Sequence, residues 1–115
     1  MKQLIYITLF ICSSISLQAQ NYLRNTGTSS HIRMTGGNLV LLDTNFEILG
    51  GSMGASGTTA RVIVRGTTAT ANSGIGGTGN TQFVDLEIDK TTNNARLLGD
   101  IEVDQNVIMT QGNLN

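Results

Sequence analysis

The sequence predicts an all-β protein made of short strands that stack on one another. Short apolar runs recur between residues 39 and 109, and Gly, Asn, Asp or Thr separates most of them, which is the pattern of strands joined by turns. Beyond residue 20, no stretch carries the apolar i, i+3, i+4, i+7 stripe of an amphipathic helix. Three runs begin at even intervals, at Leu39, Arg61 and Phe83, as expected for stacked turns of similar length.

Residues 1–19 predict a cleaved secretory signal peptide, which is the one helix that the sequence indicates. Lys2 supplies a short positive start, residues 4–17 are mostly apolar, and the small side chain of Ala19 favours cleavage after Ala19 or Gln20. A transmembrane anchor needs about 20 apolar residues, so we expect no stable membrane span. A lipoprotein anchored through Cys12 is a further alternative, which the bulky residue before this Cys disfavours.

The composition excludes several classes of function. Cleavage after Ala19 removes the only Cys, and a mature chain without Cys has no disulfide, thiol nucleophile or thiolate metal ligand. The formal net charge is −1, whereas nucleic-acid-binding domains carry a basic surplus. We therefore expect no nucleic-acid partner.

Alternation of apolar and charged residues indicates which side of each strand faces the core. In residues 83–89, Val84, Leu86 and Ile88 share one side, and the acids between them share the other. We expect the apolar side to form the core and the acids to face water. Residues 61–65 follow the same scheme with an Arg at each end, and these arginines are candidates for exposed ion pairs with the acids.

A repeated sequence motif indicates internal repetition. Residues 34–40 read MTGGNLV and residues 109–115 read MTQGNLN, and Gly-Asn is turn chemistry in both places. We interpret this repeated motif as part of a long-period repeat, because stacked repeats bury a continuous core. The expected organisation is a signal peptide at 1–19, an N-terminal lead-in at 20–33 and a repeat region at 34–115. We expect this region to be truncated at its C-terminal end and to continue in further repeats of the same chain.

Three strand motifs follow one another in residues 81–115. They read F-x-x-L-x-I, L-x-G-D-I-x-V and, more loosely, L-x-L-T-x-G-x-L with its turn. The matching positions are Phe83, Leu86, Ile88, Leu98, Gly99, Asp100, Ile101, Val103, Val107, Met109, Thr110, Gly112 and Leu114. Together they resemble a unit of very large secreted surface proteins from Gram-negative bacteria that use the type IX secretion system, and the resemblance extends upstream to about residue 34.

This resemblance implies a parallel β-solenoid, similar to a β-helix, in an adhesin-like or cell-surface protein. The residues themselves leave open whether the strands form a regular β-helix or two short packed sheets. The resemblance also implies export beyond the inner membrane.

Five acids on two strands are the candidate metal ligands. Calcium binds several oxygens at once. Acids at alternate positions of one extended strand lie about 6–7 Å apart, so a site also needs a neighbouring turn. We favour a solvated acidic face, and paired catalytic carboxylates are a further alternative. The candidates for calcium are Asp85, Glu87, Asp89, Glu102 and Asp104.

Other motifs are weaker signals, and we expect no cofactor. Gly74–Gly79 matches G-x-G-x-x-G, but it lacks the preceding strand and following helix of a dinucleotide site. His31 is the only His and has no Cys to complete a metal site. Ser56 misses the spacing of a nucleophile elbow by one position. Thr67–Thr70 is too short for a flat array of Thr side chains.

Three functions remain open. We favour a non-enzymatic, secreted or cell-surface structural protein, adhesin-like, whose turns form a stalk and bind an unidentified cell-surface, extracellular-matrix or glycan partner. The alternative is an extracellular β-helix protein that binds or cleaves polysaccharide. Beyond residue 20 the aromatic residues are only Tyr22, Phe46 and Phe83, which disfavours sugar stacking. The third is a small secreted protein that closes its open last turn by oligomerisation, because an unpaired strand edge favours association.

Overall fold

The computed structural model describes residues 21–67, 73–92 and 94–115. The predicted signal peptide with Cys12, Ala19 and Gln20 lies outside the described residues, as does most of the Thr67–Thr70 run. In the part of the chain that the structure describes, all regular elements are strands, and all named strand pairs are parallel.

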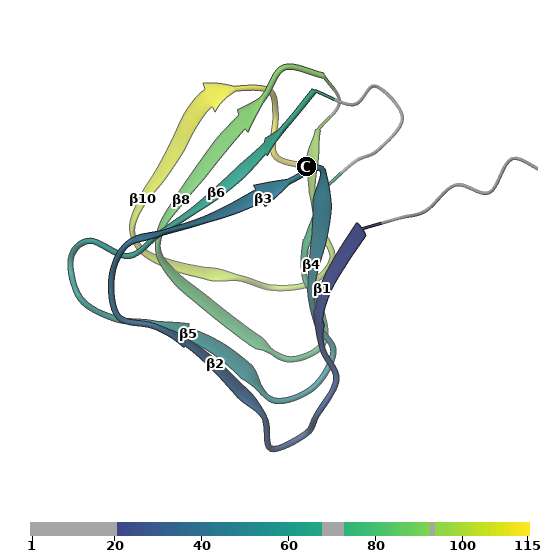
Figure 1. Ribbon diagram of the computed structural model, residues 1–115, viewed down its shortest axis with the longest axis vertical. Coiled ribbons are helices and arrows are strands. Elements are labelled where there is room, and N and C mark those ends of the chain that lie inside the picture. The colour runs from purple at the N-terminus through teal and green to yellow at the C-terminus, as the bar shows by residue number, and fades with distance from the viewer. Residues whose placement is uncertain (1–20, 68–72, 93) are drawn as a thin grey trace, which may run out of the picture.

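The chain winds as a parallel β-solenoid of about four turns with three faces, seen as a triangle in Figure 1. The predicted fold class is thereby confirmed. The first face holds β1 (Asn21–Asn25), β4 (Thr44–Ile48), β7 (Ser73–Gly76) and β9 (Ala95–Leu97). The second holds β2 (His31–Met34), β5 (Ser52–Ala55) and the start of β8 (Asn80–Lys90). The third holds β3 (Asn38–Leu42), β6 (Arg61–Gly66), the rest of β8, and β10 (Glu102–Gln111).

The first turn of the solenoid begins upstream of the expected boundary at residue 34. Strand β1 pairs with β4, and β2 pairs with β5, so residues 21–34 belong to the sheets of the stack. These strands are short and contain mostly polar residues, which is why their sequence carries no apolar run.

Inward-facing side chains form apolar columns that run along the stack. In the middle turns these side chains are fully buried, and full burial of one such side chain stabilises the fold by about 1.5–3 kcal/mol. The tilted rings of Phe46 and Phe83 pack with their centroids 6.2 Å apart. Three columns are Leu23–Phe46–Ile75–Leu97, Leu39–Val62–Leu86–Val107 and Leu41–Val64–Ile88–Met109.

The predicted facing of residues 84–88 is confirmed, since Val84, Leu86 and Ile88 are buried. Phe83 is buried as well, although alternation from Val84 places it on the outer side. The reason is that β8 turns the corner here, pairing with β5 before this point and with β6 after Val84.

The residues at which the three apolar runs begin do not pair with one another, although their even spacing suggested that they would. Leu39 lies beside Val62, and Arg61 lies beside Asp85. Hydrogen bonds between neighbouring turns join residues that are 21 positions apart in one place and 29 positions apart in another. The corner loops differ in length, and each loop therefore shifts the strand that follows it.

The two copies of the repeated motif, residues 34–40 and 109–115, lie at two different corners of the solenoid. Its first copy runs from the end of β2 into β3, whereas its second runs from the end of β10 to Leu114, which bridges to Ala95 of the first face. Both copies share a glycine in the left-handed region, with φ of 77° at Gly37 and 84° at Gly112. The repeated motif thus forms corners, and its two copies do not occupy equivalent places in successive turns.

Glycines also form the corner between the first and second faces, which we call the glycine corner (Gly51, Gly77 and Gly99). A Cβ at Gly77 would lie 2.9 Å from the carbonyl carbon of Ile48, and one at Gly99 would lie 2.8 Å from that of Gly77. Consecutive turns therefore approach so closely here that a side chain has no room.

Candidate functional site

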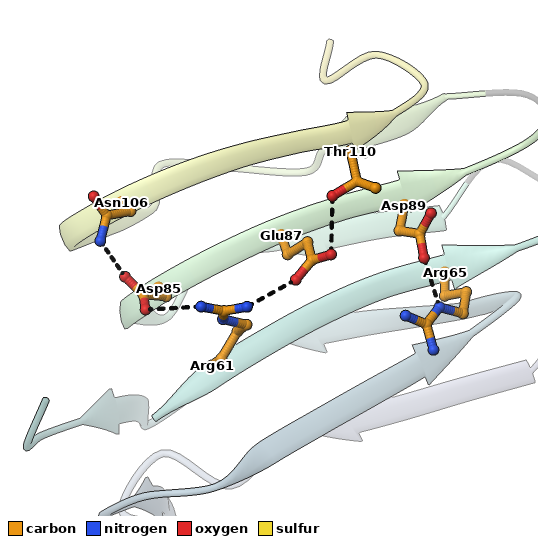
Figure 2. Close-up of polar contacts among 7 residues, drawn as sticks. All are labelled: Arg61, Arg65, Asp85, Glu87, Asp89, Asn106 and Thr110. Atoms are coloured by element: carbon orange, nitrogen blue, oxygen red, sulfur yellow. Dashed lines mark hydrogen bonds and ion pairs between the residues drawn. The ribbon is translucent and has the colours of Figure 1, made fainter. Parts of the chain in front are cut away.

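The outer side of the third face carries most of the charged side chains that the sequence marked as candidates. We call the set Arg61, Arg65, Asp85, Glu87, Asp89, Asn106 and Thr110 the charged face (Figure 2). Strand β8 supplies the three acids and lies between β6, which supplies the two arginines, and β10, which supplies the Asn and the Thr. The parallel register places Arg61 beside Asp85 and Arg65 beside Asp89.

Arg61 bridges two acids of the neighbouring turn. Its Nη1 donates to Glu87 Oε2 at 3.2 Å, and its Nη2 lies 3.8 Å from Asp85 Oδ2. The second oxygen of each acid accepts a hydrogen bond from β10: Asn106 Nδ2 donates to Asp85 at 2.9 Å, and Thr110 Oγ1 donates to Glu87 at 2.9 Å. Both oxygens of both carboxylates are therefore engaged by side chains of adjacent turns (Figure 2).

Arg65 forms the second ion pair of this face, with its Nε 2.8 Å from Asp89 Oδ2. The predicted pairing of both arginines with the acids is confirmed. The expectation that the acids face water is wrong for Asp85, which is only 6% exposed. Side chains of adjacent turns cover it, and these neighbours follow from a register that alternation within one strand does not contain.

The structure does not bring the five calcium candidates together. Glu102 pairs with Gln82 at the start of β10, and Asp104 accepts a hydrogen bond from Gln82 Nε2 at 3.0 Å. A register shift after Val103 then places Asn106 beside Asp85. In the described residues, no group of three or more His, Cys, Asp or Glu side chains could hold a metal ion. The neighbours of Asp85, Glu87 and Asp89 are instead arginines, whose charge disfavours a cation at this place.

The G-x-G-x-x-G segment forms strand β7 and the corner after it, and strand β8 begins at Asn80 where a dinucleotide site needs a helix. His31 is exposed, and its Nδ1 lies 2.7 Å from Ser52 Oγ in the next turn. The backbone N–H of Ser56 donates to the carbonyl oxygen of Met34. Thr67, the described residue of the Thr run, donates its backbone N–H to Asp43 Oδ2.

A shallow hollow of about 600 Å³ lies at the glycine corner of the later turns. Its lining contains one carboxylate, that of Asp100, and no aromatic ring. The lining residues are Gly77, Thr78, Gly79, Asn80, Leu98, Gly99 and Asp100.

Lys90 is a buried charged residue that the sequence reasoning missed. Its side chain is fully enclosed at the end of β8, where Nζ donates to Ser73 Oγ at 3.0 Å and lies 3.5 Å from Asp43 Oδ1. The sequence did indicate this burial, because side chains alternate along a strand and Lys90 is on the same side as the inward-facing Leu86 and Ile88. Lys90 and Asp43 thus join the third face to the first through the interior of a corner.

Comparison with protein-family models, curated proteins and solved structures gave no match for this chain. Among the described residues, no helix is long and apolar enough to cross a membrane.

Proposed function

We propose that this chain is a non-enzymatic structural protein, adhesin-like, that is secreted or held at the outer cell surface. Its turns act as a stalk and present their outer faces to a cell-surface, extracellular-matrix or glycan partner. Export through a signal peptide cleaved after Ala19 or Gln20, by a route like that of type IX secretion, is part of the same proposal.

The observation that carries the proposal is the engagement of polar side chains between successive turns. On the charged face, both oxygens of Asp85 and Glu87 accept from neighbours, and Arg65 pairs with Asp89. A general acid or base must exchange a proton with a substrate and needs an oxygen within reach of it. Carboxylates that are bound on both sides favour stacking of turns, which is the property that a stalk requires.

The test is the location and mass of the protein in the cells that make it. We expect the intact protein outside the cytoplasm, starting at residue 20 or 21, and accessible to a protease added to whole cells. The control is a variant without residues 2–19, which should stay in the cytoplasm and resist the protease. An uncut leader on a cytoplasmic chain would refute the proposal.

The adhesive role is tested separately, by attachment of cells that lack the gene to immobilised glycans and matrix proteins. We expect attachment to fall in these cells and to return with the intact gene. Release of sugar fragments from a polysaccharide by the purified protein would instead support the enzymatic alternative.

A further inference from the structure

One ion pair lies inside the stack, whereas the ion pairs of Arg24, Arg61 and Arg65 lie on its outer side. Lys90 Nζ is 3.5 Å from Asp43 Oδ1, the Lys90 side chain is completely buried, and 18% of the Asp43 side chain is exposed. The cation also differs in kind, since a lysine amine that gives up a proton is a nucleophile, whereas a guanidinium keeps its charge in proteins. Lys90 is therefore the cation among these pairs that can form a covalent bond with its acid.

Gly66 lies between Lys90 and Asp43 along the stack. It pairs with Lys90 of the following turn, and it comes one residue after Arg65, the partner of Leu42 in the preceding turn. A Cβ on Gly66 would lie 2.6 Å from Asp43 Cγ, so a side chain here would displace the carboxyl group. The glycine therefore leaves a path by which Lys90 reaches across one whole turn to Asp43.

The contacts of the two groups distinguish the two oxygens of the carboxylate. Lys90 Nζ donates to Ser73 Oγ at 3.0 Å, which orients the amine, and Oδ1 is the Asp43 oxygen beside it. Oδ2 accepts the backbone N–H of Thr67, with an N to O distance of 3.4 Å. Asp43 itself has φ of 46°, in the left-handed region that few residues other than glycine adopt, and this backbone conformation fixes where its side chain starts.

We propose that Lys90 and Asp43 condense to an amide, which joins two turns of the stack covalently. The ion pair of the structure is the starting state, and one proton passes from the Lys90 ammonium to Asp43 Oδ1. The amine nitrogen then attacks Asp43 Cγ, and Oδ2 takes the negative charge beside the Thr67 N–H. A second proton moves from the nitrogen to Oδ1, the bond between Cγ and Oδ1 breaks, and water leaves. The product is a neutral amide whose carbonyl oxygen is Oδ2, and the step consumes no other reactant.

Burial and proximity both favour this bond. Two charges taken out of water carry a desolvation cost, and the amide removes both charges. Because folding holds the two groups together, the reaction is effectively unimolecular, and well-oriented groups react as if they were present at about 10⁵–10⁸ M. The exposed part of Asp43 gives the water a way to solvent. The bond lies inside residues 43–90, so further turns before or after this segment would leave it unchanged, and it is independent of where the protein is located.

The test is intact-mass spectrometry of the purified full chain, sampled at intervals after purification. We expect the main species to become lighter, by one water molecule, than the mass calculated for its measured N-terminus. The protein is then denatured and digested with trypsin, which cuts after Arg and unmodified Lys. Fragment 34–61, which contains Asp43, should be linked to fragment 66–96, which contains an uncut Lys90.

Three variants serve as controls. Lys90→Arg keeps the charge but replaces the amine by a guanidinium, so its mass should equal the calculated mass. Arg65→Lys places an amine beside Asp89 on the outer side, where water surrounds it, so this variant should lose one water as the unmodified chain does and its new lysine should stay unlinked. Ser73→Ala should slow the loss of water about tenfold or more, since the amine loses the contact that orients it. Circular dichroism should show the same strand content in all variants.

Three results would overturn the proposal. A folded chain that keeps its full calculated mass after prolonged incubation holds Lys90 and Asp43 as ions only. Loss of water without the linked fragments places the dehydration elsewhere in the chain, and so does an equal loss in Lys90→Arg.

Discussion

Replacing Gly51 by Ala tests whether close approach at the glycine corner holds the turns together. Gly51 has φ of +64°, a conformation in which an L-residue costs about 1–2 kcal/mol. Its added Cβ would lie 2.7 Å from the carbonyl oxygen of Gly27 and closer still to that of Ser30, both in the preceding turn. These are backbone atoms, so the first turn must move away from the second.

The expected loss follows from these two effects. Forcing extra atoms into a packed site costs about 1–3 kcal/mol, and with the backbone conformation the loss is about 2–5 kcal/mol. A domain of this size has a free energy of unfolding of about 5–14 kcal/mol, at about 0.05–0.15 kcal/mol per residue. The substitution should therefore remove a large part of the stability.

Gly54→Ala is the matched control, a short way further along the same turn. Gly54 lies in β5, has no atom within 4 Å of an added Cβ and has no positive φ, so the change should be neutral or stabilise by up to about 1 kcal/mol. Urea unfolding followed by circular dichroism gives the free energy of both variants. Equal stability of the two would refute the reasoning, because the backbone contacts would then not constrain the stack.

Further substitutions test other parts of the fold by the same measurement. Phe46→Ala should cost about 3–5 kcal/mol, since the side chain is completely buried, whereas exposed Val40→Ala should change stability by about 0.5 kcal/mol or less. Lys90→Met should cost about 1–3 kcal/mol, because Ser73 Oγ loses a partner. Lys90→Ala should cost more, because the buried aliphatic part of the side chain is lost as well. Equal losses for the two variants would contradict a packing role for this aliphatic part. Arg61→Ala should cost about 1–2 kcal/mol in low salt and less in about 1 M salt, and a loss that is independent of salt would argue against an electrostatic cause.

Much of the fold could be predicted from the alternation within single strands. Val84, Leu86 and Ile88 face the core because side chains alternate along a strand, and this rule needs no knowledge of neighbours. The pairing of Arg61 and Arg65 with the acids also followed from their outward position.

The register between turns could not be predicted, because it depends on the corner loops. Strand β7 begins seven positions after β6 ends, whereas β4 begins two positions after β3 ends, so the step along the chain from Phe46 to its partner Ile75 is longer than the step from Leu23 to Phe46. Asp85 is buried only because this register brings neighbouring side chains over it. The calcium hypothesis also depended on the register, which separates Glu102 and Asp104 from the other acids.

The position of a charged residue in the stack decides what its charge can do. Arg61 and Asp85 lie in middle turns, where the turns on either side supply their partners, so their charges hold the turns together. Lys90 points inward at the end of β8, and its charge is partnered inside the stack by Ser73 and Asp43. The direction in which a charged side chain points, and the strands that lie beside it, therefore decide whether its charge acts between turns or inside a corner.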